Sequence, residues 1–553
     1  MTKRTLEDPP EEQELRAIKR VRTDQHDRLS SLSDEILLHI LSFLPIPSLL
    51  TCQRLSRRFH SLAGDSELWK RKYYNRWVLP RARRLRRNVD SPDSVPYSAD
   101  VSRWLDHGHL AMDVQSTSWK KQYRLKHNWS TGACRVTEFE IARPPIAPVI
   151  VKLESGIVFA ADATKGLRAW LMRQPESPLA ECDFDAIRDK VGSPTAITAM
   201  PRENSRNIFE VVVGFENGGH ALYTLNTSAK IFERSFICYG HGDGTITNLA
   251  SSSGYVLTLT QTQLLTLYRI RSDIDLLDEL PRMCRVTSLQ ASNIQDPVSL
   301  SIRKISRDII VSIAYSFIRI GCGWSAGIQE LRLNEEGETL ESRVATSVDP
   351  QQTNGLWESP PGRTPGLQFT STLGKRQLSA SSHSHPPTSI SYSHPYLLLS
   401  HADNTLTMYL VVSTSDHLSI KPGRRLWGHT SSVESVQVSE RGKAISMSPK
   451  GNDIRIWELE SVASSAPSSR KALRQDSSIR ISPERPPTRL RRLDPGTSTS
   501  NNAKPRSILD LPFDSASEKP AQMRRLVGFD DEQVVVLRQL KAGDQILGCY
   551  NFT

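Results

Sequence analysis

Seven stretches between Cys134 and the C-terminus repeat one pattern, and this repetition constrains the fold more than any other feature of the chain. In most of them an apolar run of strand length meets a polar tight turn, and a second strand ends near an aromatic side chain. The stretches are residues 156–170, 209–225, 254–270, 309–324, 395–411, 444–459 and 533–552. Regular repetition of short hairpins is typical of an all-β repeat fold. No strand and helix patterns alternate, which argues against a doubly wound nucleotide-binding fold.

One unit, from Leu426 to Trp457, begins with Gly428-His429 and ends in a strand that carries the Trp. It resembles a WD repeat, in which a His, a strand Ser or Thr, a turn Asp and the Trp form a buried hydrogen-bonded set. The matching residues here are His429, Ser446 or Ser448, and Trp457. Lys450-Gly451 falls where the turn Asp belongs, and Asp453 lies nearer the Trp. The resemblance implies a WD-repeat-like β-propeller, and the seven hairpins predict seven blades. A structural role for His429 is favoured over a metal-binding or catalytic one.

The two ends of the β-rich region are predicted to pair. A propeller leaves only short, protected strand edges when its first and last strands meet in one sheet. The last strand, Ile546–Phe552, and the alternating run Arg135–Ile141 (RVTEFEI) are the predicted partners. We therefore expect the propeller to extend over residues 133–553.

Two segments rich in Ser, Pro, Arg and Gly, residues 335–390 and 461–522, interrupt the strand pattern. They predict disordered insertions. Replacing residues 335–385 or 465–515 with Gly/Ser linkers is expected to leave the propeller folded. Ser482-Pro483, two residues after Arg480, is interpreted as a phosphorylation site, where phosphate would offset local arginine charge. An unregulated linker explains the same residues equally well.

The stretch Leu29–Trp77 carries apolar residues at helical spacing. The predicted helices begin at three capping residues, Ser33, Ser48 and Asp65, and prolines 45 and 47 end the first of them. Three short helices bury too little apolar surface to be stable without further contacts. In the first helix Ile36 and Ile40 can face inward, which leaves Leu37 and Leu41 on a neighbouring face. Such leftover apolar surface is best explained by a partner.

These residues resemble an F-box. The matches are Leu32, Glu35-Ile36, Ile40-Leu41, Leu44-Pro45, Leu49, Cys52, Ser56-Arg57, Phe59, Asp65 and Leu68-Trp69. Two positions depart from the family, since Ser33 replaces the usual Pro and Ser48 the usual acidic residue. The resemblance implies that a Skp-type adaptor binds Leu32, Ser33, Ile36, Leu37, Ile40, Leu41, Leu44, Pro45 and Leu49. An ordinary helical hairpin packed on a larger core is the alternative reading of the same pattern.

The fold class expected for the whole chain is a small all-α F-box module followed by an all-β propeller. The expected organisation is a tail at 1–26, the F-box at 27–77, a helical linker at 78–132 and the propeller. Within the linker, Asn128-Trp129 and Gly132-Ala-Cys134 resemble the segment that joins the two domains in F-box/WD-repeat proteins. The run Arg81–Arg87 lacks interleaved aromatic residues and reads as a solvated helical face rather than a phosphate-binding patch.

Charge and motifs exclude several kinds of function. The net charge of +11 divides into +8 in residues 1–132, +7 in 461–525 and about −4 elsewhere, which argues against nucleic-acid binding by the propeller. The seven cysteines are far apart and no apolar run is long enough to span a membrane, so we expect reduced thiols in the cytoplasm, the nucleus or both. No hydrolase, phosphate-binding or zinc-protease motif occurs, so neither a catalytic residue nor a metal or cofactor is predicted.

The family resemblance implies the function. The chain is expected to be the non-catalytic substrate receptor of an SCF-type ubiquitin ligase, with the F-box bound to the Skp adaptor, a cullin joined through that adaptor, and an unknown target protein on the propeller. One alternative is a scaffold that binds the adaptor without a cullin and has no role in degradation. In another the propeller is itself an enzyme or a small-molecule binder, which requires polar side chains that converge on the central channel.

Overall fold

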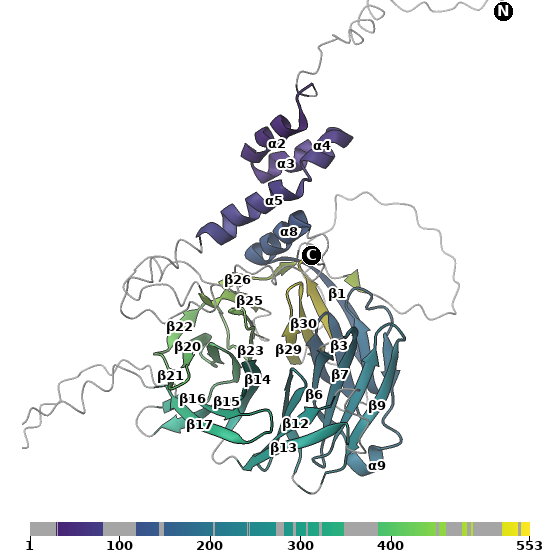
Figure 1. The fold of residues 1–553 in the computed structure, drawn as a ribbon, viewed down its shortest axis with the longest axis vertical. Helices are drawn as coiled ribbons and strands as arrows, with labels where there is room; N and C mark the ends of the chain where they lie inside the picture. The colour runs from purple at the N-terminus through teal and green to yellow at the C-terminus, as the bar shows by residue number, and fades with distance from the viewer. Residues whose placement is uncertain are drawn as a thin grey trace, which may run out of the picture. The chain divides into compact units, whose positions relative to one another are not determined.

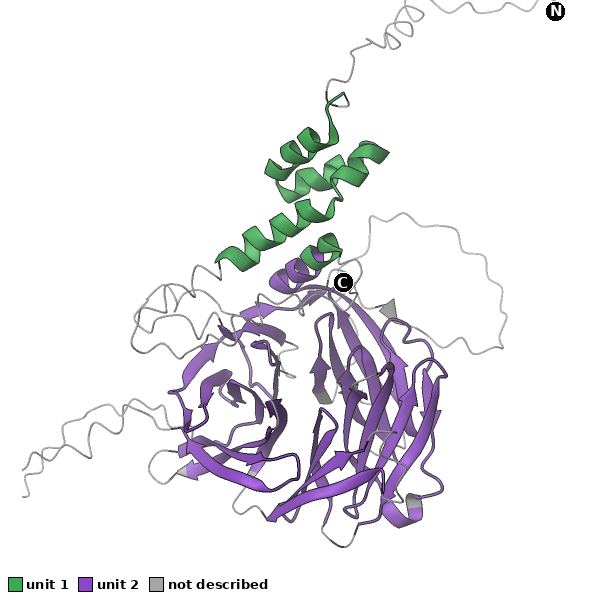
Figure 2. Cartoon of the chain, in the orientation of Figure 1, with its two compact units in different colours: residues 1–84, 110–123 green, residues 85–109, 124–553 purple. Residues whose placement is uncertain are grey.

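The computed structural model describes residues 29, 31–80, 118–142, 149–202, 205–240, 242, 244–271, 281–290, 295–305, 308–319, 323–347, 385–448, 453–460, 478–483, 488–489, 523–539 and 544–553. The chain divides into two compact units (Figure 2). The first, here the helical unit, comprises residues 1–84 and 110–123, and the second, the propeller unit, comprises residues 85–109 and 124–553.

The helical unit is built from short helices. They are α2 (Asp34–Phe43), α3 (Ile46–Cys52), α4 (Arg57–Leu62), α5 (Ser66–Tyr73), a π-helical turn η1 (Tyr74–Val78) and the first residues of α8 (Trp119–Thr131). The side chain of Asp65 accepts hydrogen bonds from the backbone N–H groups of Glu67 and Leu68, as expected of a helix cap. The predicted second helix is in fact two, because Ser56 caps α4 through the backbone N–H of Phe59. Pro45 rather than Ser48 precedes α3, and the Ser33 side chain makes no capping hydrogen bond.

Aromatic residues from the predicted linker complete the helical unit. Trp119 and Tyr123 of α8 are buried against Trp69, which also donates its indole N–H to the Ala63 carbonyl at 2.8 Å. Arg76 donates to the Tyr123 hydroxyl at 2.7 Å. Residues 119–123 therefore belong to the helical unit and not to a separate linker over 78–132, because their large side chains supply apolar area that the short helices lack.

The propeller unit contains seven sheets among its described residues, which are the predicted seven blades (Figure 1). Six blades are β2–β5 (Ile150–Glu154, Ile157–Asp162, Gly166–Leu171, Ala180–Cys182), β6–β9 (Pro194–Arg202, Ser205–Phe215, His220–Asn226, Ile231–Cys238), β10–β13 (Ile246–Ser252, Tyr255–Thr260, Leu264–Ile270, Met283–Gln290), β14–β17 (Gln295–Ile305, Asp308–Arg319, Gly323–Leu333, Thr339–Thr346), β18–β22 (Ser389–Ser393, Tyr396–Ser400, Thr405–Ser413, Leu418–Ile420, Arg424–Trp427) and β23–β26 (Ser435–Val438, Lys443–Ser448, Asp453–Glu458, Ser478–Arg480). A short helix, α9 (Arg188–Val191), lies between the first two.

The seventh blade joins the two ends of the propeller chain. It contains β29 (Met523–Phe529), β30 (Gln533–Gln539), β31 (Gln545–Asn551) and β1 (Ala133–Ala142), with the short strands β27 (Ser482–Pro483) and β28 (Thr488–Arg489) on the outer edge of β1. Strands β1 and β31 are antiparallel, with Val136 opposite Tyr550. The predicted pairing of Arg135–Ile141 with the C-terminal strand is therefore confirmed.

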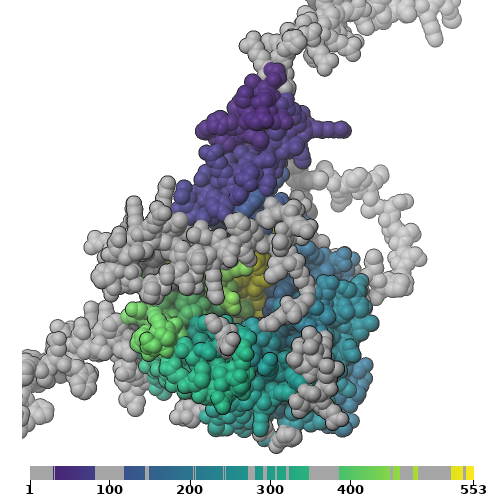
Figure 3. Space-filling model, viewed as in Figure 1, coloured from purple at the N-terminus to yellow at the C-terminus, as the bar shows by residue number. Residues whose placement is uncertain are grey.

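Each of the seven predicted hairpins forms the two middle strands of a blade: β3–β4, β7–β8, β11–β12, β15–β16, β19–β20, β24–β25 and β30–β31. These strands are the most deeply buried, and residues 157–162 of β3, for example, are buried at every position. Apolar side chains from neighbouring blades merge into common clusters, and the blades on the visible face pack directly against one another (Figure 3).

Both predicted insertions are too long, because each range includes residues that form strands. Residues 335–390 include strand β17 and the start of β18, and residues 461–522 include β26, β27 and β28. These strands have few apolar residues, and they form because an adjacent strand edge offers backbone partners, as in the β16–β17 ladder from Gly327 to Leu333. Replacing 335–385 or 465–515 with a linker would therefore remove blade strands.

Candidate functional site

Helix α2 presents its apolar residues on two different faces. Leu37 and Leu41 are buried and pack with Leu49, Leu62 and Leu68 in the core of the helical unit. Ile36 and Ile40 face away from that core and are 49% and 40% exposed. The predicted orientation was therefore wrong, because Ile36 and Ile40 point outward while Leu37 and Leu41 point inward.

Phe43 extends the exposed face by one further turn and is 71% exposed. Ile36, Ile40 and Phe43 follow one another at intervals of four and three residues, so they lie along one side of α2. We call these three residues the apolar stripe. Exposed large side chains that line up in this way mark a contact surface more strongly than scattered ones do.

Both ends of α2 are held in place by long basic side chains. At the N-terminal end, Arg58 Nη2 donates to Asp34 Oδ1 at 2.7 Å and to the Leu32 carbonyl at 2.6 Å. At the C-terminal end, Lys72 Nζ donates to the carbonyls of Ser42 and Leu44 at 2.8 and 2.7 Å. A cation that bonds the last carbonyls of a helix satisfies groups that the helix leaves unpaired. The apolar stripe is therefore presented on a firmly anchored helix.

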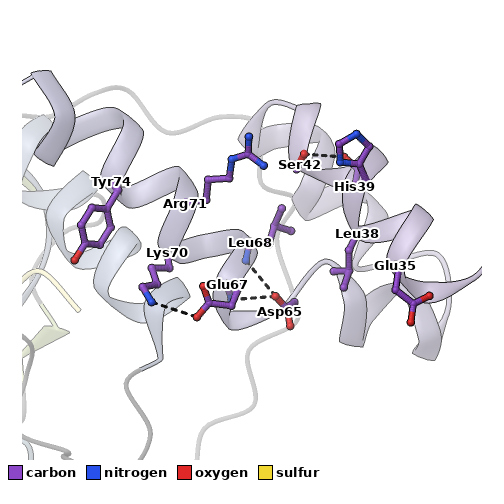
Figure 4. A pocket seen from close by; sticks show the side chains of 10 residues that line it. All are labelled: Glu35, Leu38, His39, Ser42, Asp65, Glu67, Leu68, Lys70, Arg71 and Tyr74. Atoms are coloured by element: carbon purple, nitrogen blue, oxygen red, sulfur yellow. Dashed lines mark hydrogen bonds and ion pairs between the residues drawn. The ribbon is translucent and has the colours of Figure 1, made fainter.

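A groove lies on another side of α2, between it and α5, and has a volume of about 570 Å³ (Figure 4). It is lined by Glu35, Leu38, His39, Ser42, Asp65, Glu67, Leu68, Lys70, Arg71 and Tyr74. Hydrogen bonds from its own backbone N–H and from the Ser33 hydroxyl lower the pKa of Glu35, so this carboxylate is charged at neutral pH. The two surfaces of α2 thus differ in chemistry, because the groove carries charged side chains and the apolar stripe carries none.

The predicted contact residues divide into surface and core. Ser33, Ile36, Ile40 and Pro45 are exposed, and Leu32 and Leu44 are half-buried against the core. Leu37, Leu41 and Leu49 are fully buried and are corrected from contact residues to core residues, because side chains that fill the core of the unit cannot also bind a partner. Phe43 was missed, although it lies seven residues after Ile36 and so belongs to the same side of the helix.

In the propeller unit, the residues of the predicted WD-type set meet inside the sixth blade. Trp457 Nε1 donates to Ser446 Oγ at 2.7 Å, and this hydroxyl lies 2.6 Å from His429 Nε2. The other ring nitrogen of His429 is 3.3 Å from an oxygen of Asp453, the acidic residue that the sequence places close to the Trp. Ser448, the alternative to Ser446, instead donates to the Ser432 carbonyl at 2.8 Å.

Burial controls the charge of two histidines in the propeller unit. It lowers the pKa of His429 to about 4, against the opposing effect of Asp453, and it lowers the pKa of His220 to about 4 as well. Both rings are therefore neutral at pH 7. A buried neutral ring held between Ser446 and Asp453 has a structural role and is not a general acid at that pH.

These histidines are expected to make the propeller unit less stable in acid. Because each folded-state pKa lies below the ordinary value near 6.5, the unfolded chain binds protons first, and stability falls between about pH 6.5 and pH 4. A shift of this size corresponds to at most about 3 kcal/mol per histidine. Denaturant unfolding of His220→Phe at several pH values should show a smaller loss below pH 6.5 than the unsubstituted protein. Identical pH profiles would contradict this assignment.

The described residues contain no group of three His, Cys, Asp or Glu side chains that could hold a metal ion. Within the same part of the chain, no helix is long and apolar enough to cross a membrane.

The short helical unit and the seven blades define an F-box protein with a C-terminal propeller. Comparison with protein families supports both parts: an F-box-like family model matches residues 29–75, and the model described as "F-box protein pof12 beta-propeller" matches residues 134–553. The chain belongs to this F-box protein pof12 beta-propeller family.

Individual relatives resemble different shares of the chain. F-box protein pof12 of Schizosaccharomyces pombe is 21% identical over 445 residues, which cover 78% of this chain and 84% of that protein. F-box protein dre-1 of Caenorhabditis elegans is 32% identical over 125 residues, covering 22% of this chain and 11% of that protein. F-box only protein 15 of Bos taurus is 35% identical over 98 residues, covering 18% of this chain and 19% of that protein. The chain therefore spans less than a fifth of the length of the last two.

Proposed function

We propose that this protein is the substrate receptor of an SCF-type ubiquitin ligase. The helical unit binds a Skp-type adaptor, the adaptor connects it to a cullin, and the propeller unit binds the target protein. The receptor carries out no chemistry of its own. The observation that carries this proposal is the apolar stripe of Ile36, Ile40 and Phe43, exposed on a unit whose family is defined by the F-box.

The energetics of the apolar stripe favour a protein partner. Burying one large aliphatic side chain contributes roughly 1.5–3 kcal/mol, so the three residues together are worth several kcal/mol on binding. Aromatic residues such as Phe43 are also enriched in the buried cores of protein interfaces, from which charged residues are depleted. A charged side chain introduced into this surface would be desolvated without a partner and should oppose binding.

The double variant Ile36→Asp/Ile40→Asp is expected to weaken adaptor binding roughly a hundredfold or more, since two buried aliphatic contacts are replaced by buried charges. Binding of purified Skp-type adaptor is measured by calorimetry or pull-down. The matched control is Arg71→Asp, which places the charge on the α5 side of the groove and should bind nearly normally. Normal binding by the folded double variant would refute the proposed surface.

A second pair of variants separates binding from folding. Leu41→Asp puts a carboxylate in the core of the helical unit and is expected to unfold it, whereas Ile40→Asp should leave it folded. Circular dichroism of both variants, with the propeller unit present as an internal reference, checks this difference. Equal folding of the two variants would contradict the assignment of Leu41 to the core and of Ile40 to the surface of the helical unit.

Recruitment of a cullin is tested separately. Affinity purification of the full chain from cells should recover the adaptor together with a cullin, and the Ile36→Asp/Ile40→Asp variant should lose both. Recovery of the adaptor alone would refute the ligase and support a scaffold without a degradation role.

A further inference from the structure

Ser482 lies on the outward side of the seventh blade, next to the point where α8 leads into strand β1. Its backbone N–H donates to the Gly132 carbonyl at 2.8 Å, and Ser482 is opposite Ala133 in the parallel β27–β1 pairing. Both Ser482 and Pro483 are exposed. Pro483 has no N–H to donate, so the two-residue strand β27 is held weakly and can open locally.

Two exposed arginines lie close to Ser482 along the chain or across the strand pair. Arg480 precedes Ser482 by two residues, and the Arg480 side chain is 61% exposed. The residue between them, Ile481, is buried. Arg135 is exposed on β1, two residues after Ala133 and between the buried Cys134 and Val136. On β1, Arg135 points the same way as Ala133, the residue opposite Ser482, and paired strands are about 4.8 Å apart. Arg480 ends β26 of the sixth blade, and its long side chain starts two residues before Ser482. Both guanidinium groups can therefore reach a group attached to the Ser482 oxygen.

We propose that Ser482 is a phosphorylation site for a proline-directed protein kinase and that Arg480 and Arg135 hold the phosphate. The Ser482 oxygen attacks the γ-phosphorus of ATP, the bond from that phosphorus to the β,γ-bridging oxygen breaks, and ADP leaves. The hydroxyl proton passes to the catalytic base of the kinase. Arginine pairs with phosphate through two parallel hydrogen bonds, so the product is bound more strongly than the serine.

The phosphate would change the contacts of Arg480. This side chain now lies 3.2 Å from Asp453 Oδ1. Asp453 keeps Arg455 at 2.7 Å when Arg480 turns toward the phosphate, so the buried carboxylate is not left without a cation. The new pairs with Arg480 and Arg135 would tie β27 to the first residues of β1. Phosphorylation thus strengthens the edge of the blade beside Gly132.

Two other Ser-Pro pairs of this chain serve as controls for a kinase assay. Ser177-Pro178 is also exposed but follows Glu176, and Ser448, which precedes a proline, is fully buried. Treatment with a proline-directed kinase and ATP should label Ser482 and leave Ser448 unlabelled, as judged by mass spectrometry of peptides. The label at Ser482 should disappear in Ser482→Ala. Labelling of Ser177 without Ser482 would overturn the proposal.

The proposed phosphate contacts are tested by hydrogen exchange. After phosphorylation, exchange at the amides of residues 133–135 is expected to slow at least tenfold relative to the untreated protein. In the Arg135→Ala/Arg480→Ala variant, Ser482 should still be labelled but exchange should not slow. Equal slowing in the variant and the parent protein, or no slowing in either, would overturn the assignment of the two arginines.

Discussion

A chain ending at residue 544 is expected to lose the folded propeller unit while the helical unit remains folded. The deletion removes β31, which pairs with β30 on one side and with β1 on the other, so two ladders are lost at once. It also removes Leu547, Cys549, Tyr550 and Phe552, all buried. At roughly 1.5–3 kcal/mol for each large apolar side chain, this loss is comparable to the whole stability of a typical domain.

Thermal unfolding and soluble yield measure this effect, and the exposed edges of β1 and β30 should make the truncated protein aggregate. The matched control ends at Phe552 and removes only Thr553, whose bonds are local ones to the Asn551 side chain. It should unfold near the temperature of the full chain. A cooperative transition close to that temperature in the 1–544 protein would show that β1 and β31 do not close the propeller.

The second large effect is expected from Trp129→Ala in the part of α8 that belongs to the propeller unit. The Trp129 ring is 2% exposed and stacks on Phe552 with 3.9 Å between ring centroids. Its indole N–H donates to the Asp531 carbonyl at 2.7 Å, and Lys443 Nζ lies 3.7 Å from the ring centroid. Truncation of a buried Trp costs about 3–5 kcal/mol, because a large cavity is left behind.

The contact with Lys443 adds to this expectation. Burial lowers the pKa of Lys443 to about 8, and the face of an aromatic ring stabilises a desolvated ammonium group. Trp427→Ala is the matched control, since Trp427 is 61% exposed and its loss should cost less than about 0.5 kcal/mol. Denaturant titration of both variants gives the two free energies of unfolding. Similar values for the two would contradict the packing described for Trp129.

The turn from α8 into β1 requires a glycine at position 132. Its φ of +75° is in the left-handed region, and a Cβ atom there would lie 2.1 Å from the Arg480 carbonyl oxygen. Only glycine allows the chain to turn from α8 into β1 at this distance. Asn128 adds a hydrogen bond of 2.7 Å to the Phe552 carbonyl. The three residues of this short motif, Asn128, Trp129 and Gly132, therefore each pack against or bond to another part of the propeller unit.

The blades could be predicted from the sequence alone because their evidence is local. Alternation of apolar residues and tight turns identified all seven central hairpins, and the pattern of Arg135–Ile141 identified the partner of the last strand. The set of His429, Ser446 or Ser448, and Trp457 came from the resemblance to a WD repeat, and the structure shows that Ser446 is the serine that bonds to the other two.

Other features depended on residues distant in sequence, and only the tertiary structure decided them. Periodicity revealed that α2 has two apolar faces, but Leu37 and Leu41 became the core because Leu49, Leu62 and Leu68 pack on that side. Strands β17 and β27 form on the edge of a neighbouring strand, which supplies their backbone hydrogen-bond partners. Their own sequences have no strand pattern that predicts this pairing. A local pattern specifies which surfaces are apolar or extended, whereas their burial depends on the elements that the whole chain brings beside them.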